Sequence, residues 1–223
     1  MKLCLSQSCT MTTPFADDLA AYAGGGCQAI EAWLTKLETH LQSHSVDETQ
    51  KLIEQHALTL AAAAMQGGLL LSLGEKRSAH WDHFKRRLDL CQRFAIPTLV
   101  VAADPVTVVE SHTLGHAIAS LAEAAQWAAG FGVRLAFKFQ GIGAVCTTLE
   151  TAVRIVEEIG DPNLGVCLDA FHFFKGPSKV EDLSLLTVSN LVHVQVCDVA
   201  GVPRELMTDS DRVFPGEGDF SRQ

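Results

Sequence analysis

Short apolar segments alternate with longer amphipathic segments along nearly all of the 223-residue chain. The apolar segments have the composition of β-strands, and the segments between them carry apolar residues at helical spacing among Ala, Glu and Arg. Such an alternation predicts parallel strands joined by crossover helices. The sequence therefore predicts an α/β fold that repeats one strand–helix unit.

Seven segments are predicted as strands, and several are apolar almost throughout, as expected for strands covered on both faces. The predicted strands are residues 2–6, 26–34, 58–64, 97–102, 134–139, 165–169 and 191–198. The clearest predicted helices are residues 47–56, 81–94, 111–131 and 147–159. Gly130, Gly132 and Gly160 indicate where the last two of these helices end.

A repeated strand–helix unit can close an eight-stranded barrel or build an open doubly wound sheet, and the pattern alone does not separate them. Seven predicted strands leave a (β/α)8 TIM barrel one strand short, and residues 211–223 resemble a loop. No linker rich in Pro, Gly or Ser divides the chain. We therefore expect residues 1–223 to form a single domain that lacks the last unit of a barrel.

Composition limits the partners that this chain can have. A formal net charge of −9 at pH 7 repels a phosphate backbone, so nucleic acid is not an expected partner. The seven cysteines are scattered and never form a CxxC pair, which is typical of reduced thiols. The N-terminus is a poor signal peptide, and no apolar run approaches the roughly 18 residues of a membrane span. A cytoplasmic protein without a membrane partner is expected.

Polar side chains follow three of the predicted strands, and parallel strands of this kind bind ligands at their carboxyl ends. Asp169 ends one strand, and His172 lies three positions later. His193 and Gln195 share one face of the next strand because side chains alternate with a period of two. Lys138 lies near the end of the strand that precedes them.

Each of these residues also has an ordinary structural interpretation. An Asp after a strand is often a helix N-cap, and a single His is often a buried residue with a satisfied hydrogen bond. For Asp169 together with His172 we favour a functional role. For His193 we favour a structural role, with a backbone group as its partner. Arg212, in the turn-rich segment 211–219, fits equally well a contact with an anionic or hydroxyl-rich ligand and a charged surface loop.

At these residues the sequence resembles the sugar phosphate isomerases and epimerases of the xylose-isomerase-like TIM barrel superfamily. The resemblance is strongest at residues 165–172 (GVCLDAFH), 193–198 (HVQVCD) and 212–219 (RVFPGEGD), and weaker at 29–33 (AIEAW). It extends over nearly the whole chain. Barrels of this kind often pair, so a homodimer is a candidate assembly.

The resemblance implies a divalent metal, Mn²⁺ or Mg²⁺, which polarises a carbonyl while a base moves a proton on the neighbouring carbon. By position, Asp169 and Gln195 would be metal ligands, while Glu31, His172 and Arg212 would contact the substrate. Lys138 and His172 are the candidate catalytic residues.

Lys138 departs from the family pattern, because the resemblance implies a Glu ligand at this position on the fifth strand. An ammonium group donates hydrogen bonds and cannot coordinate a cation. We favour an ion pair with Asp169 in a site that has lost its metal. A neutral lysine acting as base or Schiff-base nucleophile, and a carbamylated lysine acting as an oxygen ligand, are the alternatives. The strand-eight Glu that the resemblance also implies would lie beyond Gln223.

The sequence therefore indicates two candidate functions. The first is a metal-dependent isomerase or epimerase that acts on a small sugar or polyol ketone, with a dehydratase of the 3-dehydroshikimate type as a related lyase. The second is a metal-free barrel that binds a sugar-like ligand without turnover, for which Lys138 is the distinguishing residue. A relative of the apurinic endonucleases fits less well, because the chain is acidic and has few His and Glu residues at strand ends.

Overall fold

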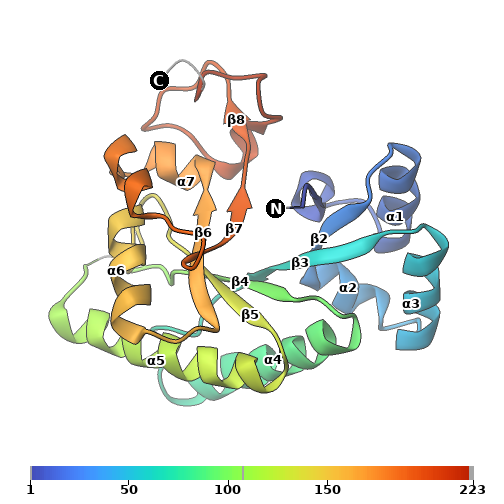
Figure 1. Cartoon of the computed structure of the whole chain (residues 1–223), viewed down its shortest axis with the longest axis horizontal. Coiled ribbons are helices and arrows are strands. Elements are labelled where there is room, and N and C mark those ends of the chain that lie inside the picture. Colours follow the sequence, from blue (N-terminus) through green and yellow to red (C-terminus); the bar gives the residue numbers. More distant parts are fainter. Residues whose placement is uncertain (1, 107, 221–223) are drawn as a thin grey trace.

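The computed structural model describes residues 2–106 and 108–220 and contains one large parallel sheet, which curls around its own axis (Figure 1). Seven strands follow one another in sequence order, from β1 at one edge to β7 at the other. These are β1 (Leu5–Ser6), β2 (Ala29–Trp33), β3 (Thr59–Gln66), β4 (Thr98–Ala102), β5 (Arg134–Lys138), β6 (Leu164–Asp169) and β7 (Leu191–Gln195). This is a TIM barrel fold in the form of a curled half-barrel, and it confirms the predicted fold class.

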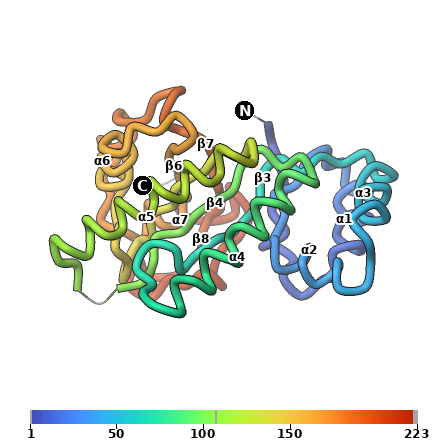
Figure 2. The backbone as a smooth tube through the Cα atoms, turned by 90° about the horizontal axis from the view of Figure 1, so that it is seen from below, coloured from blue at the N-terminus to red at the C-terminus, as the bar shows by residue number. Residues whose placement is uncertain are grey.

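The helices connect successive strands, and the longest of them lie on the outer face of the sheet (Figures 1 and 2). They are α1 (Phe15–Gly24), α2 (Leu34–His40), α3 (Val46–Gln55), α4 (Gly74–Arg93), α5 (Ser111–Gly130), α6 (Leu149–Ile159) and α7 (Ala170–Lys175). The helix α4 lies beside α5, because Arg77 of α4 donates hydrogen bonds to Ser120 and Glu123 of α5. Within the described residues, no helix is long and apolar enough to cross a bilayer.

Local sequence explains where several helices begin and end. Ser45 and Glu48 form a reciprocal capping box at the start of α3. The hydroxyl of Thr148 accepts a hydrogen bond from a backbone N–H at the start of α6. That helix ends at Gly160, whose φ of 62° lies in the left-handed region that favours glycine. Gly160 thus ends α6 as predicted.

The main core lies between the sheet and its outer helices. Phe84 of α4 and Leu121 of α5 pack in the same buried cluster as Leu99, Leu135 and Val166 of the sheet. Side chains that point to the opposite face of the strands enter the barrel interior, since successive residues of a strand alternate between the two faces. The outer helices therefore hold the strands in register, and the inner face is left to form the site.

The chain after β7 folds differently from the prediction. The strand expected over residues 191–198 ends at Gln195, and Asp198 begins a separate strand, β8 (Asp198–Val199). This strand pairs antiparallel with β9 (Arg212–Val213), a segment that was expected to be a loop. The apolar pattern continues past Gln195, but the pairing partner changes from β6 to a distant part of the chain. The hairpin returns Arg212 to the carboxyl ends of the strands.

Candidate functional site

Six polar residues meet at the carboxyl ends of the barrel strands and form one connected network, which we call the strand-end cluster. The cluster consists of Glu31 on β2, Lys138 on β5, Asp169 on β6, His193 and Gln195 on β7, and Arg212 on β9. The strands β2 and β7 are not neighbours in the sheet, yet side chains from both meet, because the sheet curls back toward itself. The fold thus joins residues that are up to 181 positions apart (212 − 31).

Glu31 lies at the centre of one half of the cluster, and only 1% of its surface is exposed. Its Oε2 accepts hydrogen bonds from His193 Nε2 at 2.7 Å and from Gln195 Nε2 at 2.8 Å. Its Oε1 accepts one from the Ser6 hydroxyl at 2.5 Å. Burial alone raises the pKa of Glu31, but the donors from His193, Ser6 and Gln195 outweigh burial and lower that pKa. The carboxylate is therefore ionised although it is buried.

Lys138 lies at the centre of the other half of the cluster and is 7% exposed. Its ammonium donates a hydrogen bond to Asp169 Oδ2 at 3.3 Å and another to Gln195 Oε1 at 3.1 Å. The two ends of the Gln195 amide therefore point to opposite charges, with the oxygen toward Lys138 and the nitrogen toward Glu31. The ion pair favoured for Lys138 from the sequence is the contact that the structure contains.

Asp169 is both a helix cap and a member of the cluster. Its Oδ1 accepts hydrogen bonds from the backbone N–H groups of Phe171 and His172 at the start of α7. Its carboxylate also accepts two hydrogen bonds from Arg212, at 3.0 and 3.2 Å. Burial raises the pKa of Asp169, but Lys138 and Arg212 outweigh it and hold that pKa at about 2. Asp169 is thus the N-cap of α7, and its functional role stays a prediction.

Arg212 reaches the cluster from the β8–β9 hairpin rather than from a barrel strand. Its guanidinium lies 4.2 Å from the ring centroid of Phe171 and also contacts the carboxylate of Asp209. Burial lowers the pKa of Arg212, while the carboxylate of Asp169 outweighs it and raises that pKa. Arg212 is therefore not a free surface charge.

His172 lies on α7 beside Asp169 and is 6% exposed. Its Nδ1 accepts a hydrogen bond from the backbone N–H of Gly141 at 3.2 Å, and its Nε2 lies 3.9 Å from Asp169 Oδ2. Burial lowers the pKa of His172 to about 4, against the raising effect of Asp169. The imidazole is therefore neutral at pH 7, with its proton on Nε2, and it can donate a hydrogen bond but not accept one there.

Two site features differ from the sequence interpretation. His193 was expected to bond a backbone group, but its partner is the carboxylate of Glu31 on the far side of the barrel. Sequence reasoning did not single out Ser6, which also bonds Glu31. A polar residue at the end of the first predicted strand was the available signal, and it is the same signal that identified Lys138 and Asp169.

The donor set of the cluster does not fit a divalent metal ion. Within residues 2–106 and 108–220, no group of three or more His, Cys, Asp and Glu side chains is arranged to hold one. Lys138 lies between Asp169 and Gln195, the two expected ligands, and donates to an oxygen of each. A cation bound to those oxygens would meet the ammonium directly. In this geometry the oxygens of Asp169 and Gln195 are occupied by Lys138, and their role as metal ligands stays a prediction.

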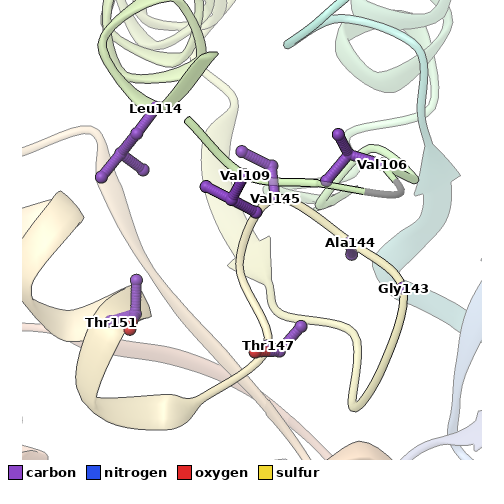
Figure 3. Close-up of a pocket in the computed structure, with 8 residues that line it drawn as sticks. All are labelled: Val106, Val109, Leu114, Gly143, Ala144, Val145, Thr147 and Thr151. Atoms are coloured by element: carbon purple, nitrogen blue, oxygen red, sulfur yellow. The ribbon is translucent and has the colours of Figure 1, made fainter. Parts of the chain in front are cut away.

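A separate hollow of about 470 Å³ lies between the loops that follow β4 and β5 (Figure 3). Val106, Val109 and Leu114 contribute side chains to it from one loop and the start of α5, and Val145 and Thr147 contribute from the other. None of the described residues that line it is ionisable. The hollow therefore offers apolar contact area rather than acid–base chemistry.

Comparison with known proteins places these features in a family. The family model described as xylose isomerase-like TIM barrel matches residues 18–222. The chain belongs to this family. An inosose isomerase from Halalkalibacterium halodurans is 30% identical over 230 residues, which cover 98% of this chain and 79% of the relative.

A solved structure has the same fold over nearly the whole chain. The crystal structure of the IolI protein with a bound zinc atom superposes with a TM-score of 0.89 at 26% identity, covering 98% of this chain and 80% of that one. A 3-dehydroshikimate dehydratase from Pseudomonas aeruginosa is 25% identical over 151 residues, which cover 66% of this chain and 23% of the relative. Proteins named inosose isomerase and 3-dehydroshikimate dehydratase are thus both similar to this chain.

Proposed function

We propose that this protein is a sugar isomerase that acts on a small polyol ketone of the inosose type and moves a proton between carbons next to a carbonyl. Similarity to inosose isomerases over 98% of the chain supports the substrate class. The observation that carries the proposal is Glu31, a buried and ionised carboxylate in the mouth of the barrel. A positioned carboxylate is a suitable base for proton transfer at carbon.

The hydrogen bonds of Glu31 leave one acceptor position of its carboxylate unused. A carboxylate offers about four acceptor positions. Ser6 uses one position on Oε1, while His193 and Gln195 use the two on Oε2. Among the described residues, the second position on Oε1 has no hydrogen-bond partner, and there Glu31 would take the substrate proton.

The neighbouring residues then have distinct roles in this proposal. His193 and Gln195 hold the carboxylate of Glu31 in one orientation, which a base that acts at carbon requires. His172 donates from Nε2 to a substrate hydroxyl, since its neutral ring has no free acceptor on that atom. Arg212 fixes Asp169 and borders the space that the substrate occupies. His172 is thus a substrate-binding residue rather than a base.

Turnover assays with three substrate classes test the proposal. Purified protein is incubated with an inosose, a ketohexose or 3-dehydroshikimate, and products are followed by NMR. We expect wild type to isomerise the inosose. The Glu31→Gln variant should have about 10³-fold lower kcat/KM, because a general base contributes about 10²- to 10⁴-fold to the rate. Glu54→Gln, the same change at an exposed position on α3, should match wild type. If the protein converts only dehydroshikimate, it is a lyase and the isomerase proposal is wrong.

A second candidate function is binding of a sugar-like ligand without turnover, and the position of Lys138 favours it. In that case calorimetry would detect inosose binding while NMR detects no product. We also carry the cytoplasmic location, the single domain and the homodimer into this proposal as expectations from the sequence.

A further inference from the structure

We infer that Lys138 is the electrophile of the strand-end cluster: its ammonium binds the carbonyl oxygen of the ligand, so that the site works without a divalent metal ion. The inference rests on the proposed function for its chemical step, but its binding part stands independently. It begins from the position of Lys138, which is buried between Asp169 and Gln195 at the end of β5.

The hydrogen bonds of Lys138 leave one donor for a ligand. An ammonium has three N–H groups. One donates to Asp169 and one to Gln195, and the contacts among the described residues account for no third. The Lys138 side chain is 9% exposed, so it is not completely closed off from solvent.

The oxygens that would bind a metal are already in use. Asp169 accepts from five donors, namely the backbone N–H groups of Phe171 and His172, the Lys138 ammonium and two nitrogens of Arg212. The Gln195 oxygen faces Lys138, and its nitrogen faces the carboxylate of Glu31. A metal ion at these oxygens would have to displace an ammonium from each.

The charges of the cluster balance without a metal ion. Lys138 and Arg212 carry positive charge, and Glu31 and Asp169 carry negative charge, so the four groups sum to zero. A divalent ion would leave an excess of two positive charges in a largely buried site, where unpaired charge is costly. The arrangement therefore fits a neutral, oxygen-rich ligand.

The chemical step needs a base beside the carbon that loses its proton and a positive group beside the oxygen of the adjacent carbonyl. Glu31 and Lys138 bond opposite ends of one side chain, Gln195, at 2.8 and 3.1 Å. When Glu31 takes the proton, the electron pair of the C–H bond forms a carbon–carbon double bond. The π electrons of the carbonyl group then move onto its oxygen. The negative charge develops on that oxygen, where an ammonium stabilises it.

The step balances without an oxidant or reductant. A proton passes from the neighbouring hydroxyl to the charged oxygen, so that the enediolate charge moves to the second oxygen. The protonated Glu31 returns its proton to the former carbonyl carbon, and the second oxygen becomes the carbonyl. The product is an isomer of the substrate, and Lys138 remains an ammonium throughout.

Binding and metal content test the inference together. Wild type, Lys138→Met, Lys138→Arg and Lys138→Glu are treated with a chelator, checked for folding by thermal unfolding, and analysed for bound metal. Inosose binding is then measured by calorimetry and turnover by NMR. The matched control is Lys51→Met, the same change at an exposed position on α3.

We expect metal-free wild type to bind inosose, and added Zn²⁺ or Mn²⁺ to leave its affinity and kcat/KM unchanged. Lys138→Met should lose about 10²-fold in affinity or kcat/KM, because removal of one donor to a developing oxyanion has an effect of about this size. Lys51→Met should match wild type. Lys138→Arg should recover part of the loss, because it keeps the charge. Lys138→Glu should gain affinity for Mn²⁺, because it places a carboxylate beside Asp169.

Two results would overturn the inference. One is a stoichiometric metal ion in wild type whose removal abolishes inosose binding, which would also indicate a carbamylated Lys138. The other is a folded Lys138→Met variant that binds inosose as well as wild type does. If wild type binds inosose through Lys138 but converts none, the isomerase proposal fails while this inference stands.

Discussion

At the scale of single residues, Asp169 shows how one side chain serves both the fold and the site. It begins α7 by accepting two backbone hydrogen bonds, and the same carboxylate forms ion pairs with Lys138 and Arg212. A carboxylate can do both because its two oxygens accept from several directions. The position of α7, and with it His172, is therefore tied to the charge state of the cluster.

Arg212 should not be replaceable by lysine. Its planar guanidinium donates two hydrogen bonds to Asp169 and stacks on Phe171, whereas a lysine offers a point charge on a flexible chain. We expect Arg212→Lys to lower the free energy of unfolding by about 1–2 kcal/mol, measured by urea denaturation.

The matched control is Arg154→Lys on α6, whose exposed guanidinium pairs with Glu150 one helical turn away. Exposed pairs of this kind contribute little to stability, so no measurable change is expected there. Equal effects of the two substitutions would show that the bidentate contact of Arg212 with Asp169 does not stabilise the fold.

Single residues were predictable from the sequence where they followed a strand. Lys138, Asp169 and Gln195 were identified in this way, and the structure brings all three together. The partner of His193 could not be predicted, because Glu31 lies 162 positions away and only the curl of the sheet brings the two together. Their catalytic and binding roles remain predictions.

At the scale of elements, the segment after β7 is organised by one buried carboxylate. Asp198 accepts hydrogen bonds from the backbone N–H groups of Val199, Gly216 and Phe220. A Cβ atom on Gly218 would lie 2.3 Å from an oxygen of the same carboxylate, so glycine is required at that close approach. Asp198 therefore holds the hairpin that carries Arg212.

Replacing Asp198 with asparagine should loosen this hairpin. An amide has one acceptor oxygen in place of two, so the part-buried N–H of Gly216, which bonds the second oxygen, loses its partner, at a cost of about 1 kcal/mol. We expect Asp198→Asn to lower the midpoint of thermal unfolding and to speed proteolysis within residues 200–218.

Asp82→Asn at an exposed position on α4 provides the comparison for Asp198→Asn. It removes the same charge without touching the hairpin, so its unfolding midpoint and proteolysis should match those of wild type. Unchanged proteolysis in Asp198→Asn would contradict the account of the hairpin.

Periodicity predicted the barrel strands better than it predicted the elements around them. An apolar run such as Leu99-Val100-Val101 has one stable environment, a buried parallel strand, and β4 is found there. The short helices α1, α2 and α7 were not predicted, and neither was the β8–β9 pairing. Short elements depend on tertiary contacts that no local pattern contains.

At the scale of the whole molecule, curvature of the sheet creates the site. Within the described residues β1 and β7 are the two edges of the sheet and are not paired with each other. Glu31 of β2 nevertheless meets His193 of β7 inside the barrel. The sequence predicted the barrel through its repeated unit and its family resemblance. The homodimer and the single domain stay predictions, because no contact described here tests them.

Hydrogen–deuterium exchange tests the central claim most directly. An inosose is incubated with the purified protein in D₂O, and the ¹H NMR signal of the C–H next to the carbonyl is followed. We expect this signal to decay and the isomer to appear with wild type, but not with Glu31→Gln. If the signal persists at stoichiometric enzyme, with calorimetry showing inosose bound, the protein does not move a proton at this carbon and the proposed isomerase is wrong.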